Sequence, residues 1–114
     1  MNEELIFKVK GNNYTLKYPN VGEFRRIESL KQVLSSGMYN QLVSTNTTQA
    51  QASADMVDIE ATLTVLAPKL VEDLKTNNFE ELGIKDFYEL KTAYVEQILP
   101  WWNEMLKQVG LVDE

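Results

Sequence analysis

The sequence predicts an α+β fold that is mainly α, with an N-terminal β-hairpin packed on about four helices. Apolar and polar residues alternate over residues 4–18, which is typical of strands that bury one face. Apolar residues then recur every three or four positions over much of residues 20–110, as in amphipathic helices. The 114 residues match the usual length of one domain. We therefore expect a single domain over residues 1–114, with a hairpin at 4–18 and a helical body at 20–110.

The hairpin is predicted from two alternating runs around Gly11-Asn12-Asn13, residues that tolerate the positive φ of tight turns. Pro19 ends the second strand because proline has no N–H to donate to a ladder. The side chains expected on the buried face are Leu5, Phe7, Val9, Tyr14, Leu16 and Tyr18.

The first helix is predicted to begin at Asn20, because Asn20 and Glu23 have the spacing of a capping box. Ser35-Ser36-Gly37 is expected to close it, and residues 38–43 suit a short helix or turn. Residues 44–53 (STNTTQAQAS) are polar and uncharged, which predicts a mobile loop.

Two further helices are predicted to be broken by proline, at Pro68 and at Pro100. A proline inside a helix removes one hydrogen bond and clashes with the preceding turn, at a cost of about 3 kcal/mol. The apolar stripe stays in phase across Pro68, so we expect a kink, or two successive helices with Pro68 in the first turn of the second. The last helix is expected to follow a cap at Asp86 and to end at Gly110.

Composition excludes several classes of function. There is no cysteine and no histidine, which removes thiolate and imidazole catalysis and the usual metal ligands. The formal charge of −6 argues against binding to nucleic acid or to anionic lipid. Adjacent carboxylates such as Glu72-Asp73 suit solvated helix faces or caps better than catalysis. Asp55 and Asp58 could approach each other, but two carboxylates alone make a poor cation site. We expect no enzyme activity, no cofactor and no metal.

The start of the chain, MNEELIFKVKG, is acidic and lacks the long apolar core of a signal peptide. No stretch of the sequence has the length and apolar character of a membrane span. We therefore expect the protein in the cytoplasm of its cell, or in a particle assembled there, without a membrane partner.

The remaining expectation is that the chain binds a protein partner. The question is then which residues of the chain form the binding surface. Trp101 and Trp102 are adjacent, so on a helix they diverge by about 100°. Either one packs in the core while the other faces a partner, or both wrap the same core edge. Arg25 and Arg26 suit a partner's phosphate or carboxylate, or ordinary surface pairs with Glu23 and Glu28. The candidate partner-binding residues are Tyr94, Trp101, Trp102, Pro68, Arg25 and Arg26.

The run KGNNYTLKYPNVGEFRRIESLKQVLSSGMY resembles the opening of small tail assembly chaperones of long-tailed, siphovirus-like bacteriophages. The later motifs L-x-P-K-L, F-x-E-L-G-I-x-D-F and Q-x-L-P-W-W are similar as well. The resemblance covers residues 5–108 apart from residues 44–53, and it rests on spacing without a catalytic signature.

The resemblance implies a non-enzymatic chaperone that binds the helical tape-measure protein, with self-association, while the tail tube polymerises. Two other interpretations remain open. The chain is alternatively a structural virion component, such as a neck, connector or internal cargo subunit, or a small host-interaction protein.

Overall fold

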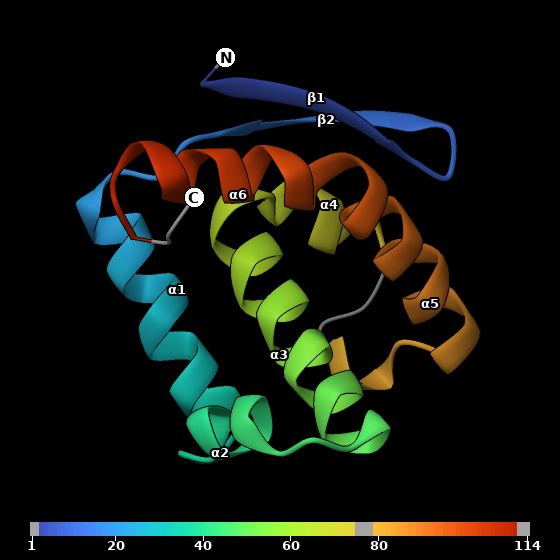
Figure 1. Ribbon diagram of the computed structural model, residues 1–114. Helices are drawn as coiled ribbons and strands as arrows, with labels where there is room; N and C mark the ends of the chain where they lie inside the picture. Colours follow the sequence, from blue (N-terminus) through green and yellow to red (C-terminus); the bar gives the residue numbers. More distant parts are fainter. Residues whose placement is uncertain (1–2, 75–78, 112–114) are drawn as a thin grey trace. The chain divides into compact units, whose positions relative to one another are not determined.

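A computed structural model describes residues 3–74 and 79–111 (Figure 1). It has an N-terminal two-stranded antiparallel sheet followed by helices, which confirms the mainly α, α+β fold. The chain divides into two compact units: residues 1–18 with 72–114, and residues 19–71. The single domain over residues 1–114 remains a prediction.

The hairpin of the first unit consists of β1 (Glu4–Val9) and β2 (Asn12–Lys17). Its register pairs Leu5 with Leu16 and Phe7 with Tyr14. Phe7, Val9, Tyr14 and Leu16 are buried, whereas Ile6 on the opposite face is 67% exposed. The predicted burial pattern is therefore confirmed at the centre of the hairpin.

The turn of the hairpin lies one residue earlier than the sequence suggested. Lys10 and Gly11 have φ values of 50° and 81°, so they form the two-residue turn whose twist matches that of the strands. Asn12 and Asn13 belong to β2. Glycine accounts for one of the two left-handed positions, and a lysine occupies the other.

The second unit begins with α1 (Val21–Leu34), which packs along α3 (Thr48–Leu66). The predicted capping box is present: Glu23 N–H donates to Asn20 Oδ1 at 2.8 Å, and Asn20 N–H donates to Glu23 Oε1 at 3.0 Å. The short helix α2 (Tyr39–Ser44) follows and also packs on α3. Of the short helix or turn expected at residues 38–43, the structure has the helix.

The loop predicted over residues 44–53 is wrong at both ends, because Ser44 ends α2 and residues 48–53 belong to α3. Helix α3 begins at Thr48, and the Thr47 hydroxyl oxygen accepts the Ala50 N–H at 3.1 Å as an N-cap. Residues 48–53 lack large apolar side chains, but alanine and glutamine are good helix formers. The cap and the apolar residues farther along α3 extend the helix into this polar segment.

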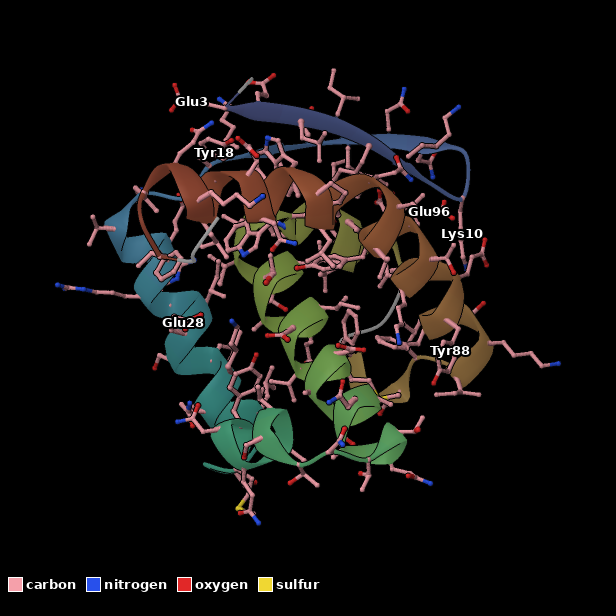
Figure 2. All side chains as sticks on the ribbon, in the orientation of Figure 1. Glu3, Lys10, Tyr18, Glu28, Tyr88 and Glu96 are labelled. Carbon is pink, nitrogen blue, oxygen red and sulfur yellow. The ribbon has the colours of Figure 1, made fainter. Side chains whose placement is uncertain are left out.

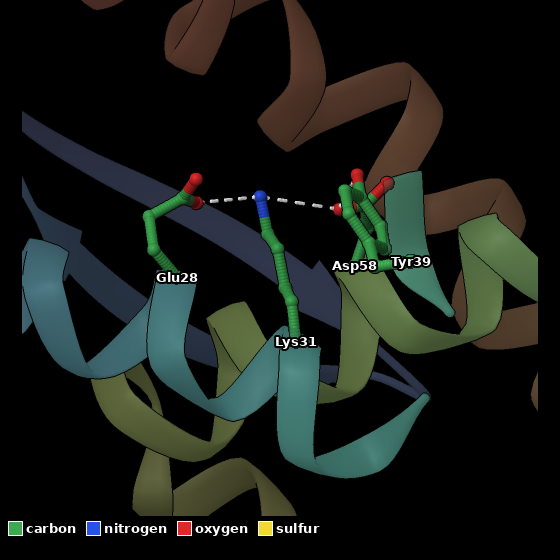
Figure 3. A network of polar contacts seen from close by, with 4 residues as sticks. All are labelled: Glu28, Lys31, Tyr39 and Asp58. Carbon is green, nitrogen blue, oxygen red and sulfur yellow. Dashed lines mark hydrogen bonds and ion pairs between the residues drawn. The ribbon is translucent and has the colours of Figure 1, made fainter. Parts of the chain in front are cut away.

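A polar network joins helices α1, α2 and α3 of the second unit (Figure 3). Lys31 Nζ lies 2.7 Å from Glu28 and 3.3 Å from Asp58. The Tyr39 hydroxyl donates to the same Asp58 carboxylate at 2.6 Å. Because Lys31, Tyr39 and Asp58 come from α1, α2 and α3, the network fixes these helices to one another.

Pro68 begins α4 (Pro68–Asp73), and only Ala67 separates it from α3. Ala67 leaves the helical region, with φ −135° and ψ 58°. The missing N–H of proline costs no hydrogen bond in the first turn of a helix, because N–H groups there have no acceptor within the helix. Of the two arrangements expected at Pro68, the structure has two successive helices.

The C-terminal part of the first unit contains η1 (Phe79–Glu81), α5 (Ile84–Ala93), the π-helical segment η2 (Tyr94–Ile98) and α6 (Leu99–Gln108). The cap predicted at Asp86 is wrong, because α5 begins at Ile84 after Gly83 and Asp86 lies in its first turn.

Pro100 does not separate two helices as Pro68 does. Leu99 N–H donates to Tyr94 C=O, a hydrogen bond one residue longer than in an α-helix. The wide turn precedes Pro100, which lies at the start of α6. The helical path continues from α5 to α6, so the expected break takes the form of a π turn.

Candidate partner-binding surface

Three of the predicted partner residues are core residues. Tyr94 and Trp101 are each 5% exposed and Trp102 is 8% exposed. The ring centroids of Trp101 and Trp102 are 6.5 Å apart, and Trp101 also lies 4.8 Å from the ring of Tyr18. The prediction that one tryptophan faces outward is therefore wrong. Both rings pack in the core, which is the other arrangement considered.

The other three predicted residues lie in the second unit. Pro68, Arg25 and Arg26 are exposed. Glu23 is engaged in the capping box and Glu28 pairs with Lys31, so neither is used for the expected arginine pairs. Neither arginine forms an ion pair with a residue in the described part of the chain. The structure does not gather the six candidates into one surface.

A different apolar surface lies on α5 and η2. Ile84, Tyr88 and Val95 are 58%, 45% and 44% exposed, and they follow one another along the same side of the helical path. Tyr88 and Val95 line an open pocket of about 270 Å³ together with Lys91, Thr92 and Glu96. We call Ile84 and these five pocket residues the α5 surface. Figure 2 labels Tyr88 and Glu96, which lie on α5 and η2.

The opposite side of the same helical path explains why these residues are exposed. Phe87, Leu90, Tyr94 and Ile98 are buried and mark the inward side of α5 and η2. Tyr88 and Val95 lie between them in the sequence and fall on the exposed side of the helix. Lys91 Nζ lies 5.4 Å from the Tyr88 ring centroid, so a cation borders the exposed apolar side chains.

A second open pocket, of about 420 Å³, adjoins the α5 surface, since Thr92 and Glu96 line both. Its other lining residues come from the hairpin end, including Lys8 and Lys10, and from α5 and η2: Glu89, Ala93 and Gln97. Lys8 N–H donates to Gln97 Oε1 at 2.8 Å, and Gln97 Nε2 donates to Lys8 C=O at 2.9 Å. The π turn thus carries the side chain that fixes β1 beside η2.

The titratable groups point to structural roles. Among the described residues no cluster of three or more acidic side chains is placed to hold a metal ion. Asp58 serves the Lys31 network, and Asp73 accepts a hydrogen bond from the Tyr14 hydroxyl at 2.9 Å. Burial raises the pKa of Tyr14, and the adjacent Asp73 carboxylate raises it further.

Tyr18 is the buried polar group without a partner among the described side chains. Its hydroxyl is inaccessible and forms no hydrogen bond. Burial raises the pKa of Tyr18, with smaller contributions from the Glu104 and Glu3 carboxylates. Because the Tyr18 ring itself packs on Trp101, the residue acts as a packing side chain.

Comparisons with known proteins return no family model, no curated protein and no solved structure that matches this chain. In the part of the chain that the structure describes, none of the helices combines the length and the apolar character needed to cross a bilayer.

Sequence reasoning missed the α5 surface because it followed the buried stripe. Phe87, Leu90, Tyr94 and Ile98 have the three- and four-residue spacing of one helix face, and all four are buried. Ile84, Tyr88 and Val95 lie off that stripe. The sequence did contain a signal for this surface: large apolar residues that lie off the buried stripe of a charged helix.

Proposed function

We propose that this chain is a non-enzymatic phage tail assembly chaperone that binds an amphipathic helix of a tape-measure protein through the α5 surface. The proposal includes the host cell cytoplasm as the place where the chain acts. One structural observation carries it: the exposed row of Ile84, Tyr88 and Val95, bordered by charged side chains.

This row has the chemistry that recognises a helix. An amphipathic helix binds by laying apolar residues from successive turns against exposed apolar side chains. Tyr88 offers a large ring with a polar end, a type of residue enriched where proteins bind one another. Lys91 and Glu96 provide charges of both signs at the pocket, which suits the polar edges of such a helix.

The sequence motifs and the charge also support the proposal. The resemblance to tail assembly chaperones spans both the hairpin and the segment that carries α5 and η2. A net charge of −6 favours solubility of a protein that must hold an aggregation-prone client. The proposed contact relies on shape and apolar area, which the exposed row on α5 and η2 supplies.

Co-expression with a tape-measure protein tests the proposal. We expect the chain to raise the soluble yield of the tape-measure protein, and Tyr88→Glu or Val95→Glu to abolish the gain. Val33→Glu is the matched control, because Val33 is 70% exposed and lies on α1 of the other unit. No gain with the unmodified chain would overturn the proposal.

Purified particles separate the chaperone from a structural virion component. A chaperone leaves before maturation, so we expect the chain to be absent from mature particles. Its presence there at a fixed stoichiometry would instead identify a structural subunit.

A further inference from the structure

The two edges of the hairpin differ in how their backbone groups are satisfied. Tyr18 N–H donates to Glu3 C=O at 2.9 Å, and the register continues through Leu5–Leu16 and Phe7–Tyr14. In an antiparallel pair every second residue directs its N–H and C=O away from the other strand. These outward-facing residues are Glu4, Ile6 and Lys8 on β1, and Asn13, Thr15 and Lys17 on β2.

The β1 edge is covered at one of these positions. Both backbone groups of Lys8 are hydrogen-bonded to the Gln97 side chain, which takes the place that a neighbouring strand would occupy. A third strand therefore cannot continue along β1 past Ile6 without displacing Gln97.

The β2 edge has no such cover. The outward backbone groups of Asn13, Thr15 and Lys17 form no hydrogen bond with any residue in 3–74 or 79–111. The side chains of all three are exposed. An unpaired strand edge of this kind is a template for another strand.

We propose that the β2 edge pairs with the β2 edge of a second copy of this chain, antiparallel about a two-fold axis at Thr15. Thr15 then lies opposite Thr15 of the second copy, and Asn13 lies opposite Lys17. This register engages all three outward-facing residues, and each facing pair exchanges both of its N–H···O=C bonds. The product is a four-stranded sheet.

The side chains favour this register. The central pair is Thr–Thr, a combination that stabilises antiparallel sheets. Lys17 faces a neutral asparagine, whereas centring the axis on Lys17 would set two lysines directly opposite each other. On the packed face, buried Tyr14 comes opposite buried Leu16 of the second copy, so the apolar face continues across the new junction.

The inference is independent of the tape-measure proposal, because the β2 edge and the α5 surface share no residue. Sedimentation velocity from micromolar to millimolar concentration measures it. The unmodified chain is expected to shift toward twice its 13.1 kDa mass as concentration rises. A chain that stays monomeric over this range would refute the inference.

Two proline variants identify the edge. Thr15→Pro removes an N–H that the hairpin does not use, so dimerisation should weaken about tenfold or more. Ile6→Pro is the matched control, since it removes the equivalent N–H from β1, and dimerisation should be unchanged. If Ile6→Pro alone disrupts the dimer, the contact lies on the β1 edge and the proposed β2 contact is wrong.

A charge exchange tests the register without altering the backbone. Thr15→Lys and Thr15→Glu each set like charges opposite each other at the two-fold axis, so each alone should dimerise more weakly than the unmodified chain. An equimolar mixture of the two variants should restore the dimer, because the introduced lysine of one copy then faces the introduced glutamate of the other. Mixing without recovery would contradict the Thr15-centred register even where Thr15→Pro has impaired folding.

Discussion

The Gln97 side chain holds both backbone groups of Lys8, through hydrogen bonds of 2.8 and 2.9 Å. These residues are 89 positions apart in the chain. Gln97 lies in the π turn before Pro100, so a helical irregularity and a strand edge are joined by one amide. A side-chain amide suits this role because it has a donor and an acceptor side by side.

Gln97→Ala should destabilise the first unit by about 1–2 kcal/mol, because two hydrogen bonds are lost and water replaces them at an exposed edge. Urea denaturation measures the change. Glu96→Ala is the control, since Glu96 is exposed and forms no such bond with β1. Equal stability of the two variants would show that the amide adds nothing.

Tyr18→Phe should leave the free energy of unfolding unchanged or raise it by up to about 1 kcal/mol, because the buried hydroxyl has no hydrogen-bond partner. Tyr14→Phe should lower it by about 1 kcal/mol, because the bond to Asp73 is lost. Thermal unfolding compares the two. A larger loss for Tyr18→Phe than for Tyr14→Phe would contradict the assigned hydrogen bonding.

The same tyrosines predict how stability depends on pH. Their folded-state pKa values are raised, so the unfolded chain loses these protons first as the pH increases. Stability is therefore unaffected by these groups below their unfolded pKa of about 10 and decreases above it. Melting temperatures from about pH 8 to 11 should show the decrease, and Tyr18→Phe should make it shallower. An identical slope in the variant would argue against a raised pKa for Tyr18.

Trp101→Ala and Trp102→Ala should each lower the free energy of unfolding by about 3–5 kcal/mol, because both rings are buried. Asn103→Ala is the control, since the neighbouring Asn103 is exposed. Chemical denaturation measures all three. A tryptophan variant with unchanged stability would restore the idea that one ring faces a partner.

Thr47→Ala should destabilise the second unit by about 1 kcal/mol, because the N-cap bond to Ala50 is lost. Amide hydrogen exchange localises the effect. Faster exchange should be confined to the first turns of α3. Fast exchange of residues 51–53 already in the unmodified chain would instead support the mobile loop expected from the sequence.

The features that sequence reasoning predicted correctly are governed by local chemistry. Alternation placed Phe7 and Leu16 on the buried face, the Asn20–Glu23 spacing gave a true capping box, and Pro68 begins a helix. Each depends on residues a few positions apart. The position of the hairpin turn did not follow from the sequence, because Lys10 occupies a left-handed position that its residue type does not announce.

The features that sequence reasoning missed depend on tertiary packing. Adjacent tryptophans diverge on one helix, yet both are buried, which requires surroundings on more than one side of α6. The π turn changes the phase between α5 and α6, and no residue type marks such a turn. The α5 surface could be identified only after the structure had shown which side of α5 and η2 is buried.

The central claim, that the α5 surface binds an amphipathic helix, is tested most directly by NMR. Amide shifts of the ¹⁵N-labelled chain are followed while a helical segment of the tape-measure protein is added. We predict the largest shifts at Ile84, Tyr88, Lys91 and Val95, and their loss in Tyr88→Glu but not in Val33→Glu. Saturating addition without shifts, or with shifts confined to residues 19–71, would contradict the account.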